Sequence, residues 1–184
     1  MTATGKGEAL WIRAPLALLC AEDAGGGLVV AGGKILELVP TSAAPRTPGC
    51  AVFDASAHVV LPGLVNTHHH FYQTLTRACP PALDKPLFPW LEALYPVWSR
   101  LTPGAFRLAV RVALAELLLS GTTTAADHHY VFPSGLEDAI DIEVEEAKAL
   151  GIRAVLTRGS MSLSQDDGGL PPRSVVQSLS LIHI

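Results

Sequence analysis

The sequence has little charge and no long apolar run. Charged residues make up 16% of the 184 residues, the formal net charge is -4, and Lys and Arg do not cluster. Without a basic field, little would attract a nucleic-acid backbone. No run approaches the ~20 apolar residues of a membrane span, and the first residues lack the pattern of a secretory signal. We therefore expect a cytoplasmic protein with no nucleic-acid and no membrane partner.

Cysteine is scarce. Cys20, Cys50 and Cys79 are an odd number at long spacings, so they form neither a CxxC metal pair nor a disulfide framework. This usage favours a reducing compartment. Hydrophobic residues reach 49%, which is typical of a globular protein, and the length suits one domain or parts of two.

Residues 1–61 contain short β-strand patterns. The segment "GLVVAGGKILELV" is two apolar runs joined by Gly32 and Gly33, which predicts a hairpin. The runs "ALWIR", "LALLC" and "AVFDA" are similar in length. We expect a partial β-sandwich domain, too short to close its sheets without strands from elsewhere.

Residues 62–177 alternate between strand and helix patterns. The strands are "GLVNTH", "TTTAA" and "IRAVLTRG". One helix lies between Thr102 and Gly121, and a second runs from Ser134 to Gly151. This α/β order implies a parallel sheet with right-handed crossovers.

Two α/β architectures fit that order, a doubly wound sheet and a (β/α)8 TIM barrel. No GxGxxG follows the first strand, and polar residues gather where strands end, which favours the barrel. A whole barrel needs ~250 residues. We therefore expect a barrel that is truncated after about three of its strands.

The candidate metal site is "HHH" at the end of the first barrel strand. Side chains alternate along a strand, so His68 and His70 face the same way and His69 faces the other. Two imidazoles on one face can bind one divalent ion, and nitrogen ligands favour zinc or iron. The simpler alternative is a pair of exposed histidines in a loop.

Asp127, His128 and His129 end the next strand and lie within reach of the same cavity. They are candidates for a further ligand, for groups that orient the ligands, or for satisfied core residues. The sequence leaves these alternatives open.

Three further residues are candidates for binding substrate. The Gln73 amide both donates and accepts, which suits a planar heterocycle, although a surface glutamine fits equally. Trp90 is suited to stacking on a ring or to core packing. Arg158 ends the third strand, where it would bind an anionic or carbonyl group or pair with Asp127.

Several longer segments together resemble the amidohydrolase superfamily. They are "LPGLVNTHHHFYQTLTRA", "LFPWLEALYPVW", "SGTTTAADHHYVFP" and "TRGSMSLSQDDGGLPP". The resemblance extends from about residue 9 to residue 177 and is closest to the 8-oxoguanine deaminases and their guanine- and triazine-deaminating relatives.

The resemblance implies a TIM barrel that carries a β-sandwich built from both chain ends. It implies one divalent metal, usually zinc, bound by His68 and His70, and contact between Gln73 and a purine-like ring. The implied activity is hydrolytic deamination of a small heterocyclic substrate, and we expect the full-length form to be a homo-oligomer. A triazine or other heterocycle aminohydrolase is the near alternative.

The resemblance also shows what the chain does not supply. The family's remaining ligands, a histidine on the fifth strand and an aspartate on the eighth, have no counterpart here, nor do its proton-shuttling glutamate and histidine. Residues 178–184, "SLSLIHI", look like a non-native tail. The alternative of another class is therefore a catalytically inactive fragment.

Overall fold

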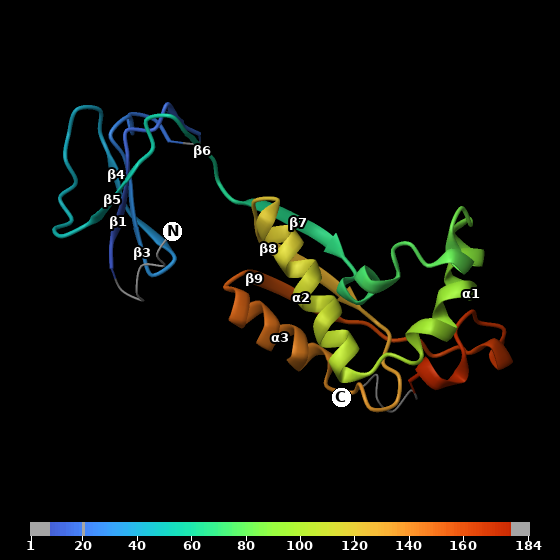
Figure 1. The fold of residues 1–184 in the computed structure, drawn as a ribbon. Coiled ribbons are helices and arrows are strands. Elements are labelled where there is room, and N and C mark those ends of the chain that lie inside the picture. Colours follow the sequence, from blue (N-terminus) through green and yellow to red (C-terminus); the bar gives the residue numbers. More distant parts are fainter. Residues whose placement is uncertain (1–7, 20, 178–184) are drawn as a thin grey trace. The chain divides into compact units, whose positions relative to one another are not determined.

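The computed structural model describes residues 8–19 and 21–177. They divide into two compact units, and the division lies between Pro62 and Gly63 (Figure 1). Within the described residues, no helix combines the length and apolar character needed to cross a bilayer.

In its described part, the first unit contains two small sheets. The larger has the strand order β4-β3-β1-β5, and the smaller pairs β2 with β6 in parallel. The predicted hairpin is confirmed: β3 and β4 are antiparallel, and Gly32 and Gly33 turn the chain with φ of 56° and 75°. The strands are β1 (Leu10–Arg13), β2 (Ala17–Leu18), β3 (Gly27–Ala31), β4 (Lys34–Val39), β5 (Ala51–Asp54) and β6 (Val59–Val60).

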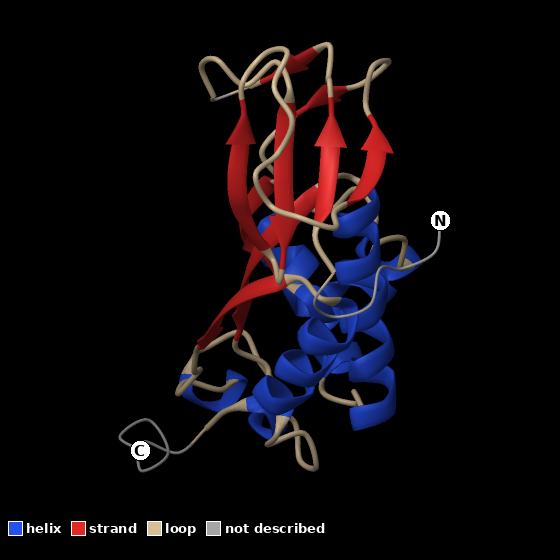
Figure 2. Ribbon diagram, turned by 90° about the vertical axis from the view of Figure 1, so that its left-hand side faces the viewer, coloured by secondary structure: helices blue, strands red, loops and turns tan. Residues whose placement is uncertain are grey.

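The second unit has a parallel sheet in the order β7-β8-β9, as the strand–helix alternation predicts (Figure 1). Figure 2 shows the strands in red and the helices in blue. Between residues 63 and 177, three α-helices and four short 3-10 helices accompany the sheet. The elements are β7 (Leu64–His69), η1 (Phe71–Thr76), η2 (Pro80–Ala82), α1 (Leu87–Trp98), α2 (Pro103–Leu119), β8 (Thr122–His129), α3 (Ala139–Leu150), β9 (Arg153–Arg158), η3 (Gln165–Asp167) and η4 (Arg173–Val175).

Helix α2 begins where the sequence predicts. The Thr102 hydroxyl accepts a hydrogen bond from the Ala105 N–H at 3.3 Å, and Pro103 occupies the first turn, where its missing N–H costs nothing. Phe106, Val110 and Leu114 repeat at helical spacing and are fully buried.

Helix α3 begins later than predicted. Ser134 was expected to cap it, but the cap position is Asp138. The intervening residues form a turn: Leu136 N–H donates to the Pro133 carbonyl at 3.0 Å, and Gly135 has a φ of 83°. The Glu137 carboxylate also accepts from Gly135 N–H, so local side-chain bonding competes with the helix.

The helices α2 and α3 cover one face of the sheet. Helix α2 packs against β8, α3 packs against β9, and the two helices contact each other (Figure 1). Alternate β8 residues Ala125, Asp127 and His129 are buried on this helix face, whereas Ala126 and His128 are only half-buried. The opposite, open face of the sheet therefore remains accessible at the strand ends.

Candidate metal centre

The parallel strands bring the predicted metal ligands to one edge of the sheet. His68 lies near the end of β7 and His70 directly follows it, while His128 lies near the end of β8. Neighbouring β7 and β8 run in parallel with His69 beside Asp127. The carboxyl ends of parallel strands are also where ligands bind in barrels and open α/β sheets.

The rings of His68, His70 and His128 form one cluster. The centroids of His68 and His70 lie 4.9 Å apart with the rings at 87°. His128 stacks on His68 at 4.6 Å and 27°, and lies 6.2 Å from His70. The structure therefore brings the two predicted ligands together and places His128 beside them.

The His70 ring is held in the form that a metal requires. Its Nδ1 lies 2.7 Å from the His128 carbonyl oxygen. Because a carbonyl only accepts, Nδ1 carries the proton and the lone pair is left on Nε2. Burial lowers the pKa of His70, which also favours the neutral ring.

This donor set fits a divalent ion. Two neutral imidazoles suit zinc or another borderline metal, and a backbone acceptor on the non-ligating nitrogen is the usual way that a ligand histidine is oriented. His68 is exposed and His70 half-buried, so solvent can reach both rings. The residues His68 and His70 would hold the ion.

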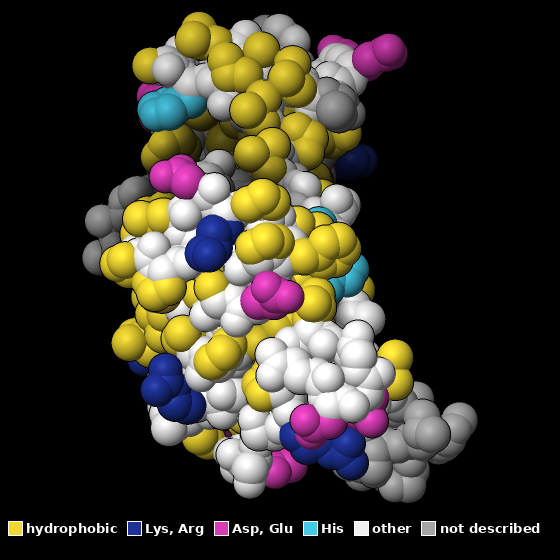
Figure 3. Space-filling view, turned by 90° about the vertical axis from the view of Figure 1, so that its right-hand side faces the viewer, with side chains coloured by type: hydrophobic (Ala, Val, Ile, Leu, Met, Phe, Trp, Pro, Cys, Tyr) yellow, Lys and Arg dark blue, Asp and Glu magenta, His cyan; other side chains and the backbone are white. Residues whose placement is uncertain are grey.

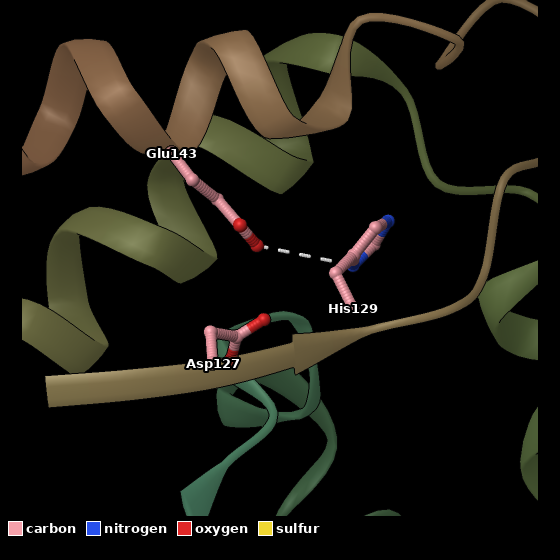
Figure 4. A group of neighbouring side chains, drawn as sticks. All are labelled: Asp127, His129 and Glu143. Atoms are coloured by element: carbon pink, nitrogen blue, oxygen red, sulfur yellow. Dashed lines mark ion pairs between the residues drawn. The ribbon is translucent and has the colours of Figure 1, made fainter. Parts of the chain in front are cut away.

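A second group of potential ligands lies on the helix face of the sheet (Figure 4). Asp127, His129 and Glu143 are fully buried, and one potential ligand atom from each lies within 4.8 Å of the others. The side chains of Asp127 and His129 come from β8 and that of Glu143 comes from α3. Full burial prevents a substrate from reaching this group.

Burial controls the charges of the second group. It lowers the pKa of His129 to about 3 and raises the pKa of Glu143 far above the ordinary range. The rings of Tyr72, Phe106 and Phe132 surround His129 at centroid distances of 5.4, 4.9 and 4.6 Å. His129 is therefore neutral, and its 3.9 Å contact with Glu143 is not a charged pair.

Gln73 lies close to the histidine cluster. It is in the 3-10 helix η1, and its backbone N–H donates to the His70 carbonyl at 3.0 Å. Its side-chain amide donates to the Tyr72 hydroxyl at 3.3 Å. The predicted substrate residue thus sits beside the ligands, with its amide engaged by a neighbouring phenol.

Trp90 is farther from the cluster. Its ring meets Trp98 edge-on at 5.4 Å, and Trp98 in turn meets Tyr72 at 5.1 Å. Tyr72 then lies 6.0 Å from His70. Two aromatic rings therefore stand between Trp90 and His70, and the observed contacts of Trp90 are core packing.

Arg158 lies on the other face of the sheet from the histidine cluster. It is in register with His129, so its side chain leaves β9 on the helix face. Its guanidinium lies 4.4 Å from the centre of the Phe132 ring, a cation–π contact. The structure does not bring Arg158 together with His68 and His70.

Tyr130 is a site residue that the sequence reasoning missed. Its ring meets His70 edge-on at 5.3 Å and Tyr72 at 5.9 Å. Tyr130 follows His128 by two residues, and alternation along the strand was the signal that could have identified it. With Tyr72, it gives the cluster an aromatic wall.

These observations agree with comparisons to known proteins. Residues 59–182 match the model of the Amidohydrolase family, so the chain belongs to that family. It is 63% identical, over 174 residues, to the 8-oxoguanine deaminase of Pseudomonas aeruginosa, covering 94% of this chain and 39% of that enzyme. It is 47% identical over 118 residues to an isoxanthopterin deaminase from an unknown prokaryotic organism, covering 63% of this chain and 24% of that enzyme.

The fold is also similar to that of solved structures. The atrazine chlorohydrolase TrzN of Arthrobacter aurescens TC1, complexed with zinc, is 28% identical with a TM-score of 0.79, covering 93% of this chain and 40% of that one. That neighbour is complexed with zinc, one of the two metals that the nitrogen ligands favour. The chain spans about two fifths of the length of the curated 8-oxoguanine deaminase.

Proposed function

We propose that this chain is part of a metal-dependent hydrolytic deaminase that acts on a purine-like ring of the 8-oxoguanine type. The observation that carries the proposal is the histidine cluster in a chain 63% identical to an 8-oxoguanine deaminase over 94% of its length. We propose further that β7, β8 and β9 are consecutive strands of a (β/α)8 barrel, and that the protein is cytoplasmic.

The overall reaction replaces a ring amino group by oxygen. A bond forms between a water oxygen and the amino-bearing carbon, and the carbon–nitrogen bond breaks. One proton of the water goes to the amino group, which leaves as ammonia, and the other stays on the product. A divalent ion held by His68 and His70 would supply a water molecule of lowered pKa, which is a nucleophile near neutral pH.

The residues of the chain position the reacting groups. The His70 Nδ1–H stays on the His128 carbonyl, so Nε2 keeps its direction. Gln73 offers an amide for the donor and acceptor atoms of the ring edge, once it leaves the Tyr72 hydroxyl. Tyr130 and Tyr72 provide apolar faces beside His70.

A chimera tests the proposal. Residues 1–177 are joined to the part of the Pseudomonas 8-oxoguanine deaminase that lies beyond its matched segment, and the protein is loaded with zinc. Ammonia release is then measured with 8-oxoguanine, guanine, isoxanthopterin and cytosine. We expect release from 8-oxoguanine; a folded, zinc-loaded chimera that releases ammonia from no ring amine would refute the proposal.

A triazine hydrolase is the second candidate function. It is favoured by the fold similarity to a triazine hydrolase from Arthrobacter, with a TM-score of 0.81 at 28% identity and 94% coverage of this chain. Adding a chlorotriazine and an aminotriazine to the substrate panel separates the two functions. Turnover of a triazine in preference to 8-oxoguanine would favour the second.

The 184-residue chain alone is the matched control for the chimera. It contains His68 and His70 but no counterpart of the family's later ligands. We expect it to release no measurable ammonia from any compound in the panel. Activity of the chimera would then depend on the joined segment as well as on residues 1–177.

A further inference from the structure

The buried group on the helix face holds several polar atoms without partners. Among the described residues, Asp127 Oδ2, both carboxyl oxygens of Glu143 and both ring nitrogens of His129 are buried and make no hydrogen bond. Buried polar atoms are nearly always paired, because an unpaired one costs free energy. The unpaired atoms of this group therefore require a physical explanation, and the histidine pair His68–His70 on the open face does not provide one.

One member of the group is bonded to the chain beside the metal pair. Asp127 Oδ1 accepts a hydrogen bond from the Phe71 N–H at 2.6 Å. Phe71 directly follows His70, whose own ring donates to the carbonyl of His128, the neighbour of Asp127. Two successive residues of β8 thus hold the chain at His70 and Phe71. Asp127 does so through its side chain, and His128 through its backbone carbonyl.

Glu143 lies where it can control the orientation of Asp127. Figure 4 shows its carboxyl group reaching down from α3 toward β8, above Asp127 and beside His129. Both carboxyl groups are fully buried and within 4.8 Å, and two negative charges at that separation in an apolar layer are strongly unfavourable. A proton shared between the Glu143 and Asp127 carboxyl groups removes one of the two charges. It also allows a hydrogen bond between one oxygen of each group.

The surroundings favour a proton in this position. Burial and the charge of Asp127 both raise the pKa of Glu143. His129 cannot compensate two carboxylates, because burial keeps it neutral. Asp127 Oδ1 is already engaged by Phe71, which leaves Oδ2 to accept from the acid form of Glu143.

We propose that Glu143 is a positioning residue for the His68–His70 pair. Its carboxylic acid donates to Asp127 Oδ2, which fixes the Asp127 side chain so that Oδ1 holds the Phe71 N–H. The peptide that follows His70 is thereby locked, and the His70 ring keeps the direction that lets it share an ion with His68. The proposal relies on the proposed function only in treating these two histidines as the metal site.

The test compares variants of Glu143 and Glu146 in the 184-residue chain. E143L removes the donor, E143Q retains one through its amide, and E146L is the matched control. Glu146 is buried on the same helix, but it pairs with Arg107 and Arg111 on α2 rather than with Asp127. Loss of either glutamate disturbs α3, so only an effect specific to E143L supports positioning.

Two quantities are measured, neither of which requires catalysis. One is the hydrogen-exchange protection of the Phe71 amide, followed by mass spectrometry at low protein concentration, where self-association of the chain is least. The other is the affinity for Zn²⁺ by competition with a chelator, corrected for the folded fraction. We expect E143L to lose most of the Phe71 protection and to bind Zn²⁺ about tenfold more weakly or worse, the range typical of lost outer-shell partners. E143Q and E146L should stay within about threefold of the parent.

Several results would overturn the proposal. One is an E143L variant that keeps its Phe71 protection, and another is an equal loss of Zn²⁺ affinity in E146L. A third is a second equivalent of bound Zn²⁺ that disappears with His129→Ala, because this would mean that the buried group binds an ion. Should E143L not fold, the parent chain decides: a Phe71 amide that exchanges as fast as an exposed amide refutes the hydrogen bond itself. None of these results depends on whether the chimera deaminates 8-oxoguanine.

Discussion

At the scale of single residues, the strand alternation of His68, His69 and His70 predicted which rings share a face. The structure places His68 and His70 at 4.9 Å and turns His69 the other way, in register with buried Asp127. The sequence did not separate the roles of His128 and His129, because both end one strand. Their contacts in the folded chain separate them. His128 stacks on His68 in the histidine cluster, whereas His129 packs against Phe106 on the helix face.

Gln73 gives the first prediction at this scale. In the chimera, Gln73→Ala should raise KM for 8-oxoguanine about three- to tenfold, the effect of one or two lost hydrogen bonds, and leave zinc content unchanged. Steady-state kinetics and metal analysis measure the two effects. Unchanged KM would remove Gln73 from the substrate site, and lost zinc would make its role structural.

Glu143 gives a prediction on pH dependence. Its pKa is raised in the folded chain above the ordinary 4.5, so the stabilisation from its protonated form is complete below pH 4.5 and is lost as pH rises toward the folded-state pKa. His129 acts in the opposite sense, because folding lowers its pKa from 6.5 to about 3. Its effect is a loss of stability that begins only when the pH drops below 6.5. Between pH 7 and 9 the Glu143 effect therefore dominates.

Urea unfolding at pH 7 and pH 9 measures this effect. The free energy of unfolding of the parent should fall by up to about 1.4 kcal/mol per pH unit, since the folded chain holds one proton that the unfolded chain has released. E143Q should show a flatter dependence, because its amide does not titrate. A parent and an E143Q variant with the same slope would contradict the buried, protonated Glu143.

At the scale of secondary-structure elements, local signals predicted most of the second unit. Helical spacing and Thr102 located α2, and Gly151 ends α3 in the left-handed region with a φ of 75°. The start of α3 was missed because Ser134 and Asp138 are both plausible caps. The turn at Gly135, with its left-handed backbone and its N–H bonded to the Glu137 carboxylate, delays the helix to Asp138. A cap pattern in the sequence does not contain these contacts.

The cap of α2 supplies a prediction at this scale. Thr102→Ala should lower the free energy of unfolding by about 1 kcal/mol, because the Ala105 N–H loses its acceptor. Thr102→Ser is the control and should cost much less. Thermal or urea unfolding of both variants tests it, and equal stability of the alanine and serine variants would show that the cap contributes nothing.

At the scale of the whole molecule, the sheet has an open face and unpaired edges. In the described residues β7 and β9 are edge strands, and exposed apolar side chains include Val65 at 63% and Val155 at 61% exposure. Figure 3 shows hydrophobic side chains over much of one side of the surface. The sequence predicted the three parallel strands of this sheet, but no pattern in it indicates what covers the open face.

This surface predicts self-association of the isolated chain. Exposed edges and apolar patches pair with other copies, so the 184-residue chain should elute from a sizing column in a broad, concentration-dependent distribution. The chimera, in which further strands can cover the same surface, should elute as a discrete species. A monodisperse monomer of the short chain at high concentration would contradict this view of its open face.

The most direct measurement is zinc binding to the chimera and to its H68A, H70A and H69A variants. One equivalent of zinc should bind the parent, and X-ray absorption should show imidazole nitrogen at ~2.0–2.1 Å. Removing either His68 or His70 should weaken binding by about tenfold or more, while H69A, altered on the opposite face, should retain it. Full zinc occupancy in H68A and H70A at parental affinity would contradict the metal centre on which the proposed deaminase rests.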